Sequence, residues 1–588
     1  MKLKRVIYFL LMSILSISIS ACGINGDINN DTSEQSNKEK NKEYEPTYGG
    51  EIVVPVIDVE TLNPLLNKSK SQYYFNKLVF EGLFSYDEDL SIKKQLVENY
   101  SIRENGRIIS LELKENVKWH DGEILTSEDV EFTINTLKYA NNDLAYKNML
   151  LSTYNVSTNK EFNNIIKTRI RDNHNIDIIF DKAYGNVLES LIFPIIPKHE
   201  FIGGGRNISD SYVRALSKNN YTPIGTGPFK FDKYNKLKEI KLVANENWWG
   251  KKPYINKVTG KILDSSNLAI TSFEAGQIDL TTTIGSDWEK YAQNEKVKIY
   301  EFPSTNYEFL AFNFKNEKFN SNKGNALRKA ISYGIDRESI IQKVYLGHGM
   351  KSNIPLPPKS WLRSSELNKY NYNKEKAKTI LEEAGWTYNS DTGVYINEAR
   401  KELVIKLLTN PYSETKRNIA ELITENLSEI GIKVIKDYQI NLPENITEEL
   451  LNKKWGEVRS KIVGGDYEVA LLEWELSNIP DLKFAFHSSQ IGASNFIFYN
   501  NKKMDQLLLE ANRVVNKQSK KNIYLEIQEL LTEDLPYVGL HFKNSALLIN
   551  DRLRGNINPQ DYNIYNNIEE WFIPEPFRKN KIDKEEVK

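Results

Sequence analysis

A single cysteine, Cys22, stands in this chain of 588 residues, and it constrains the fold more than any other residue does. With one thiol the chain cannot form an internal disulfide, a Cys-x-x-Cys redox pair or a thiolate zinc site. A chain this long exceeds what one hydrophobic core usually supports. We therefore expect several domains, each stabilised by side-chain packing rather than by covalent cross-links.

The segment before Cys22 has the pattern of an export signal. A basic start precedes an apolar run over 6–19, and the letters ISAC end at the cysteine. The run is shorter than the roughly 20 residues that cross a bilayer. We expect a signal peptide over 1–21, and the resemblance of ISAC to the bacterial lipobox predicts that Cys22 becomes a lipidated N-terminus. An ordinary secretory signal with an incidental cysteine is the alternative.

Polar segments flank the part that should fold. Residues 22–48 contain few side chains that could be buried, which predicts a flexible tether, and the charged residues 574–588 predict a frayed tail. The 78 Lys and Arg residues nearly cancel the 79 Asp and Glu residues. No basic excess is available to neutralise phosphates, so we expect no nucleic-acid partner.

Strand and helix patterns alternate between these flanks. The letters EIVVPVI over 51–57 predict a buried strand, and alternation after Gly106 predicts a half-buried one. A helix is expected to begin after Thr126 as N-cap, with Asp129 three residues on. A strand and helix unit over 402–431 repeats the pattern. The fold class is therefore mixed α/β.

Catalytic and metal-binding motifs are missing from the sequence. Six histidines are scattered without an HExxH or HxH pattern, and there is no GxSxG motif. Three glycines at 203–205 are followed by Arg206 instead of a phosphate-binding Gly-Lys-Ser/Thr, which predicts a loop. We expect no enzyme activity, no metal and no cofactor.

Several segments resemble one family in the same order along the chain. They are LELKENVKWHDGEILTSEDVEFTI at 111–134, FPIIPKH at 193–199, PIGTGPFKFDKY at 223–234, LVANENWWGKKPYINKV at 242–258, FEAGQIDL at 273–280, NALRKAISYGIDRESI at 325–340 and YLEIQELLTEDLPYVGLHF at 524–542. Together they resemble the extracellular solute-binding proteins of family 5, the oligopeptide-binding class. Most of these residues should be scaffold, with Gly225 and Gly227 supplying positive φ, Asp121-Gly122 a tight turn, and Trp248 and Trp249 packing.

The resemblance implies a two-lobed, periplasmic-binding-protein-like fold of class II, in the large peptide-binder form with an extra subdomain. The first lobe would comprise a core over 49–82 and 215–303, the extra subdomain over 83–214, and a return over 541–573. The second lobe would span 304–540. Two crossing strands are few enough to bend, so the lobes should close over a ligand.

The resemblance places candidate ligand residues on the first crossing strand. Tyr307, Phe309 and Asn313 alternate on one face if the segment is extended. For the two aromatic residues we favour a core position over ligand contact. For Asn313, a ligand or hinge contact and a core position are about equally favoured.

A second candidate cluster surrounds Trp474, with Trp455 before it and Asn495 after it. Peptide binders of the family often carry an Asp three residues after this tryptophan, where it holds the peptide amine, but this chain has Ser477. Glu475 is a possible substitute and could equally be a solvated surface acid. Otherwise the amine stays hydrated.

The resemblance implies a substrate-binding lipoprotein that captures extracellular oligopeptides and delivers them to the permease and ATPase subunits of an ABC importer. We expect a monomer held by its lipid anchor on the outer face of the bacterial cell membrane. The alternatives are another solute, namely a dipeptide, nickel complex, haem or sugar, or a receptor for a signalling peptide. A surface hydrolase is disfavoured because no catalytic motif was found.

Overall fold

The computed structural model describes residues 44–578, with gaps at 142–145, 147–150, 156–159, 164, 204–206, 220, 365–366, 368–369 and 439–447. The chain divides into two units, 1–45 and 46–588. Cys22, the expected signal peptide and most of the expected tether and tail lie outside the described residues.

A four-stranded sheet begins the fold, in the order β1-β12-β11-β10. Strand β1 has four fully or nearly fully buried residues among its seven, as its branched side chains predict, and it runs parallel to β12. The other neighbours are antiparallel. The strands are β1 (Glu51–Ile57), β10 (Phe229–Asn235), β11 (Glu239–Ala244) and β12 (Lys257–Leu263).

A second four-stranded sheet, in the order β4-β5-β9-β8, follows the first strand in the sequence. Its helix α3 (Ser127–Tyr139) begins with the expected capping box between Thr126 and Asp129. Helix α5 (Ile208–Ala215) contacts α3. The strands are β4 (Val97–Arg103), β5 (Ile108–Leu113), β8 (Ile165–Ile170) and β9 (Asn175–Phe180).

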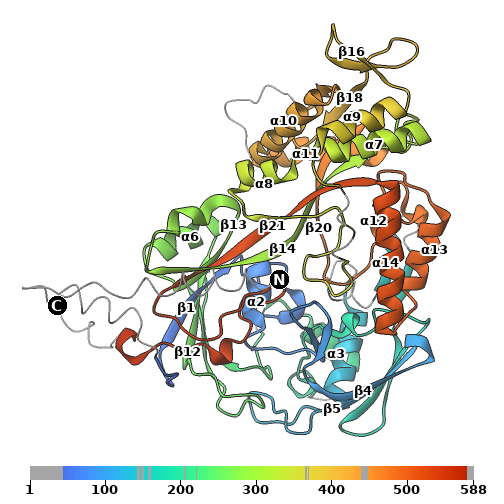
Figure 1. Cartoon of the computed structure of the whole chain (residues 1–588). Helices are drawn as coiled ribbons and strands as arrows, with labels where there is room; N and C mark the ends of the chain where they lie inside the picture. The colour runs from blue at the N-terminus through green and yellow to red at the C-terminus, as the bar shows by residue number, and fades with distance from the viewer. Residues whose placement is uncertain are drawn as a thin grey trace, which may run out of the picture. The chain divides into compact units, whose positions relative to one another are not determined.

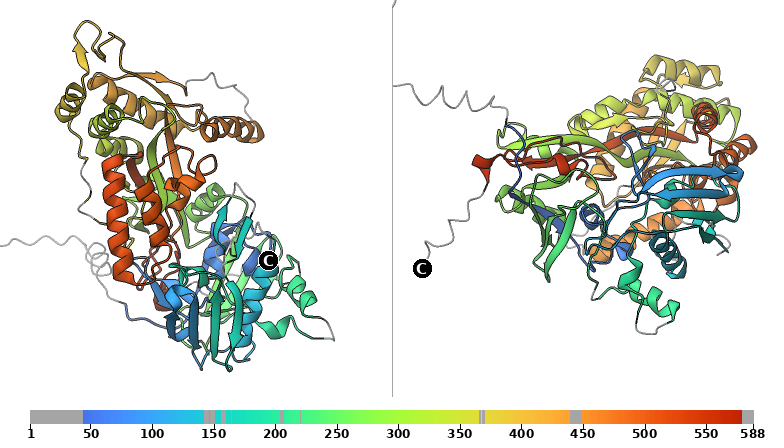
Figure 2. Two further views of the ribbon diagram at one scale, coloured as in Figure 1. Left: turned by 90° about the vertical axis from the view of Figure 1, so that its right-hand side faces the viewer. Right: turned by 90° about the horizontal axis from the view of Figure 1, so that it is seen from below.

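The largest sheet has the order β13-β21-β14-β20-β18-β19, with β15 also paired to β21. Its two longest strands, β14 and β21, lie side by side and antiparallel along most of their length (Figures 1 and 2). The strands are β13 (Leu280–Ile284), β14 (Val297–Phe312), β15 (Gly349–Lys351), β18 (Val404–Leu408), β19 (Lys433–Lys436), β20 (Val469–Glu475) and β21 (Tyr537–Asn550).

Helices cover the part of this sheet that contains β18, β19 and β20. Ser413 caps α10 as expected, and Gly431, with a φ of +75°, follows its end. The helices are α7 (Asn322–Gly334), α8 (Arg337–Tyr345), α9 (Lys374–Glu383), α10 (Glu414–Glu429), α11 (Glu448–Gly464), α12 (Lys483–Phe486), α13 (Lys502–Ala511) and α14 (Lys517–Asp534).

Shorter elements complete the described fold. The helices are α2 (Lys70–Asn76) and α6 (Ser266–Glu274), and the hairpin strands are β2 (Phe84–Tyr86), β3 (Ile92–Lys94), β6 (Leu151–Asn155), β7 (Lys160–Asn163), β16 (Thr387–Asn389) and β17 (Val394–Ile396). No helix among the described residues is both long and apolar enough to span a membrane.

Separate hydrophobic cores define two lobes. One large core contains buried residues from Ile52 to Phe302 and again from Leu547 to Ile573, and a smaller core around Trp288 lies beside it. We call this part the first lobe. The other large core runs from Tyr307 to Phe542 and defines the second lobe. Strands β14 and β21 pass from one core to the other, so we call them the hinge strands. Motion at this hinge and the finer domain boundaries stay predictions.

The glycine turn at 223–228 corrects one expectation. Gly225 and Gly227 do not have a positive φ. A Cβ on Gly225 would lie 1.8 Å from the carbonyl oxygen of Val79, and one on Gly227 would lie 2.8 Å from the carbonyl oxygen of Leu78. Glycine is needed here because two backbones approach closely, whereas Gly122, with a φ of +105°, does occupy a left-handed turn.

Candidate functional site: a cavity between the lobes

A cavity of about 450 Å³ lies where the two lobes face each other beside the hinge. This volume is in the range of small-ligand sites. The first lobe contributes residues from 67–73, together with tyrosines and the return segment, and the second lobe contributes residues that follow β20. The lining residues are Asn67, Lys68, Ser69, Lys70, Tyr73, Tyr86, Tyr146, Ile192, Thr305, Glu475, Leu476, Ser477, Asn478, Ile479, Asp561 and Tyr562.

A larger hollow of about 590 Å³ lies on the face of the sheet formed by β4, β5, β8 and β9. Its buried centre is Asp177, which already forms ion pairs with Arg103, Arg169 and Arg171. Its charges therefore have partners within one lobe. We take the cavity between the lobes as the candidate site, because two parts of a chain that meet at a hinge can enclose a ligand.

The second-lobe wall is positioned by the pairing of β20 with the hinge strand β14. Glu475 is the last residue of β20 and lies opposite Asn306. The next amide, of Leu476, donates to the carbonyl of Thr305 at 3.0 Å and ends the pairing. The Ser477 hydroxyl accepts from the Ile479 amide at 3.0 Å, which closes a local turn. The strand thus leaves the exposed side chain of Glu475 at the cavity.

The first-lobe wall is built at the start of α2 and in the return segment. The Ser69 side chain caps α2 and donates to the carbonyl of Ile57 at 2.7 Å. Lys70 forms an ion pair of 2.9 Å with Asp561, which also accepts from the Thr305 hydroxyl at 3.3 Å. Asp561 therefore joins the first lobe to the hinge, and the charge of Lys70 is already balanced.

The remaining charges of the lining are Lys68 on the first lobe and Glu475 on the second. Among the described residues, neither forms an ion pair within 4.0 Å. A carboxylate without a cation in a closing cavity favours a ligand that carries a positive charge. The cavity thus has an acidic acceptor at its second-lobe wall and a basic group at its first-lobe wall.

Tyrosines dominate the apolar part of the lining. Tyr86 and Tyr562 pack with their ring centroids 5.5 Å apart. The Tyr562 hydroxyl is buried and has no hydrogen-bond partner among the described residues. Burial raises the pKa of Tyr86 and of Tyr562, so both stay protonated and can donate to a ligand carbonyl.

Two of the predicted ligand residues, Glu475 and Ser477, line this cavity. Trp474 does not, because neighbouring residues of a strand point to opposite faces. Its ring packs against Phe484 and Phe496 at 5.1 and 5.3 Å, and its Nε1–H donates to the Tyr537 hydroxyl at 3.3 Å. Trp474 instead packs against the second-lobe core and supports the strand that carries Glu475.

Tyr307 and Phe309 are fully buried in the second-lobe core, which is the position we favoured for them. Asn313 is 2% exposed, and its side-chain amide donates to the carbonyls of Gly465 and Tyr467, both at 2.8 Å. Tyr307 and Phe309 therefore face protein in this conformation, whereas Asn313 is among the residues that line a separate hollow of the second lobe. A ligand contact by any of them stays a prediction.

Trp455 lies on α11 and packs against the second-lobe core. Asn495 is fully buried, and its amide donates to the carbonyls of His487 and Tyr499 at 3.1 and 2.9 Å. Neither residue lines the cavity. The sequence comparison missed the first-lobe wall, including Lys70, Asp561 and the tyrosines, although the polar and aromatic run QDYNIY in the return segment is a signal that could have indicated it.

A polar cluster around Glu308, which we call the hinge cluster, lies on the opposite face of β14 from Tyr307. Glu308 is fully buried and contacts Lys416 at 2.5 Å, Lys543 at 3.2 Å and His541 at 3.1 Å. Burial alone would raise the pKa of Glu308, but the nearby Lys416, His541 and Lys543 hold it well below its usual range. Glu473, two residues before Glu475, shares both lysines.

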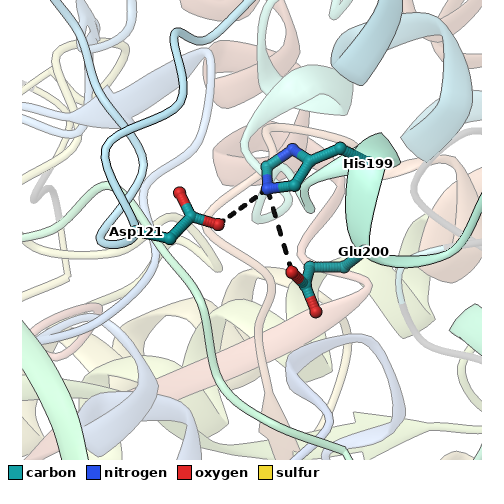
Figure 3. Close-up of side chains that lie close together, drawn as sticks. All are labelled: Asp121, His199 and Glu200. Carbon is teal, nitrogen blue, oxygen red and sulfur yellow. Dashed lines mark hydrogen bonds and ion pairs between the residues drawn. The ribbon is translucent and has the colours of Figure 1, made fainter.

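One group among the described residues has the composition of a metal site: Asp121, His199 and Glu200. His199 Nε2 lies 2.7 Å from Asp121 and 4.0 Å from Glu200, so both carboxylates approach the same nitrogen (Figure 3). Each side chain is about one third exposed. The arrangement is a partly exposed hydrogen-bonded group in the first lobe, and none of its three residues lines the cavity between the lobes.

The sequence matches one protein family along most of its length. The family model of "bacterial extracellular solute-binding proteins, family 5 Middle" matches residues 91–494. The oligopeptide-binding protein AppA of Bacillus subtilis is 30% identical over 537 residues, which cover 90% of this chain and 92% of AppA. Heme-binding protein A of Haemophilus influenzae is 27% identical and covers 83% of this chain and 85% of its own.

Among solved structures, the AppA complex with a nonapeptide from Bacillus subtilis superimposes with a TM-score of 0.59 and 27% identity. The match covers 90% of this chain and all of that one.

Proposed function

Because the chain belongs to the bacterial extracellular solute-binding proteins of family 5, we propose that it captures an oligopeptide in the cavity between its lobes and delivers it to an ABC importer. The observation that carries the proposal is Glu475, a carboxylate without an ion-pair partner among the described residues, at the wall of a cavity rich in tyrosine. The AppA relative is named for oligopeptide binding, and its structure holds a nonapeptide.

An extended peptide can use the backbone of β20. Strand β18 pairs with β20 only at Val469 and Ala470, so the later residues of β20 have no described strand partner on that edge. Extended peptides add to such free edges through main-chain hydrogen bonds, which tolerates many side chains. The peptide amine would then reach Glu475, because Ser477 supplies only a hydroxyl that is already engaged with Ile479.

The second candidate ligand is haem, because one relative is named for haem binding and tyrosine can ligate haem iron. Iron prefers the phenolate form of tyrosine. Burial raises the pKa of Tyr86 and Tyr562 and so disfavours that form. A peptide, which needs neutral hydroxyls as donors and acceptors, fits this wall better.

Purification of the full chain from its native host, followed by mass spectrometry of the released small molecules, tests the proposal. We expect peptides of several sequences, in roughly equimolar total amount with the protein. Haem absorbance, a bound metal or a sugar in their place would reject the peptide assignment. A single peptide sequence would favour the receptor alternative.

Export and anchoring are part of the same proposal. Cys22 lies outside the described residues, so the support comes from its position after the apolar run in an otherwise cysteine-free chain. The Cys22→Ala protein should leave the membrane fraction or keep its leader peptide. Unchanged membrane partitioning and unchanged mass would contradict lipidation.

A further inference from the structure

The lobes meet a second time, at a place that β14 and β21 do not reach. Here the loop 184–186 of the first lobe packs on the connection between α13 and α14 of the second. The backbone amide of Gly185 donates to the carbonyl of Asn512 at 2.7 Å, and the side-chain amide of Asn186 donates to the carbonyl of Pro480 at 3.3 Å. Figure 1 and the left view of Figure 2 show α14 extending toward the part of the first lobe that contains β4 and β5.

Lys520 is the centre of this contact. It lies near the start of α14 and is only 3% exposed. Its ammonium donates to the Gly185 carbonyl at 3.0 Å and to the side-chain oxygen of Asn186, and both acceptors belong to the first lobe. Burial lowers the pKa of Lys520, which the nearby acids Glu189 and Asp481 partly offset. A buried ammonium without those acceptors would be costly.

Gly185 shows how closely the surfaces fit. A Cβ at this position would lie 2.6 Å from the carbonyl oxygen of Val514 and 2.8 Å from that of Ala511. Both atoms are backbone of the second lobe, so they cannot move aside as a flexible side chain could. The contact therefore requires glycine because of the approach between lobes.

The same contact is connected to the cavity wall. The Pro480 carbonyl accepts from the Tyr524 hydroxyl at 2.5 Å within the second lobe and from Asn186 across the lobes. Pro480 directly follows Ile479, the last of the consecutive cavity-lining residues 475–479. Any movement of that loop thus changes an interlobe hydrogen bond.

We propose that Lys520, Gly185 and Asn186 form an interlobe latch that engages only when the loop 475–480 is in its cavity-lining position. Lys520 is a positioning residue, since it touches no part of the cavity lining. When the lobes part, water replaces the two acceptors of Lys520, and the Pro480 carbonyl loses its first-lobe donor. The inference rests on the proposed function only in taking the lobes to be parts that separate.

Hydrogen exchange of the full chain, without added ligand, tests the latch through the Gly185 amide. In Lys520→Met we expect exchange of the segment 183–187 to accelerate by at least about tenfold, as for the loss of a buried charged hydrogen bond. Hydrogen exchange of segment 476–483 should accelerate in the same variant. In the control variant Lys521→Met, both the exchange and the thermal midpoint should stay as in the wild type. Lys521 is the exposed next residue.

Gly185→Ala tests the contact independently, because the added Cβ would push the two backbones apart. Gly456→Ala is its control, because a Cβ at Gly456 meets nothing within 4 Å. We expect hydrogen exchange of the same two segments to accelerate in Gly185→Ala and not in Gly456→Ala. This pair of variants tests the latch even if Lys520→Met does not fold. The proposal is overturned if segment 183–187 of the wild type is already unprotected, or if both latch variants exchange like the wild type. No peptide is needed, so the result is independent of whether peptide binding is found.

Discussion

Glu473 and Glu475 lie two residues apart on β20, yet their surroundings differ completely. Glu473 belongs to the hinge cluster, where Lys416 and Lys543 lie 2.7 and 2.5 Å from it, and the same lysines hold the buried Glu308. Glu475 is exposed at the cavity and has no ion-pair partner among the described residues. The charges around Glu308 are paired within the protein, whereas the carboxylate of Glu475 is available to the ligand that we propose.

Glu81 in the first lobe shows what happens to a carboxylate that is buried without a cation. It accepts from the Trp249 indole at 2.8 Å and the Thr226 hydroxyl at 2.9 Å. Burial raises its pKa to about 7 in spite of these hydrogen bonds. Glu308 is buried as well, but its lysines hold its pKa well below the usual range. A carboxylate enclosed by protein therefore needs a cation beside it to stay charged.

The largest expected effect comes from breaking the hinge cluster. Lys416→Met removes one cation from Glu308 and Glu473 and should lower the free energy of unfolding by about 3 kcal/mol, since the remaining buried charge is less well compensated. Urea unfolding measures the loss. Lys406→Met, at an exposed lysine, is the control. A loss no larger than that of the control would show that the cluster does not stabilise the hinge.

Glu81 should give an effect of similar size, which appears only as a dependence of stability on pH. Because its pKa is about 7 in the folded chain and 4.5 ordinarily, the folded state binds the proton more tightly. The protonated carboxyl of Glu81 therefore contributes its full stabilisation of the folded state below about pH 4.5. This contribution, about 3 kcal/mol, is lost as the pH rises to about 7. Glu81→Gln should remove this dependence.

Trp248 and Trp249 both donate toward Glu81, so indole fluorescence can follow the same titration. Comparison of wild type and Glu81→Gln by urea unfolding at several pH values isolates the contribution of this one carboxyl. An identical slope of stability against pH in the two proteins would contradict the assignment. Glu308, whose pKa is lowered, should act in the opposite sense, losing its contribution as the pH falls.

The smallest effect on stability is expected at Glu475. Glu475→Gln removes an exposed charge without an ion-pair partner among the described residues, so unfolding should change by less than about 0.5 kcal/mol. The same measurement as for Lys416→Met makes the comparison direct. A loss approaching that of Lys416→Met would mean that Glu475 belongs to the fold and not to the ligand.

Local pattern was sufficient to predict much of the scaffold. The buried strand β1, the capping box at Thr126 and the glycine after α10 follow from short-range rules, and the structure confirms all three. The glycines at 225 and 227 show the limit of such rules. Their need for small size comes from Val79 and Leu78, almost 150 residues earlier, which sequence spacing does not reveal.

The candidate site was only partly predictable for a similar reason. Family resemblance pointed to the end of β20, where Glu475 and Ser477 do line the cavity. It did not indicate Lys70 and Asp561, which lie almost 500 residues apart and meet only in the folded chain. It also could not place Trp474, because the face toward which a strand residue points depends on where the strand pairing ends.

Calorimetric titration with pentaalanine, free or acetylated at its N-terminus, tests the central claim most directly. For the wild type we predict that acetylation costs about 2 to 5 kcal/mol, the range for removing one partner of a buried charge pair. In Glu475→Gln the two peptides should differ by less than about 1 kcal/mol. Equal affinity of the wild type for both peptides, or no binding of either, would contradict capture of a peptide through its amine at Glu475.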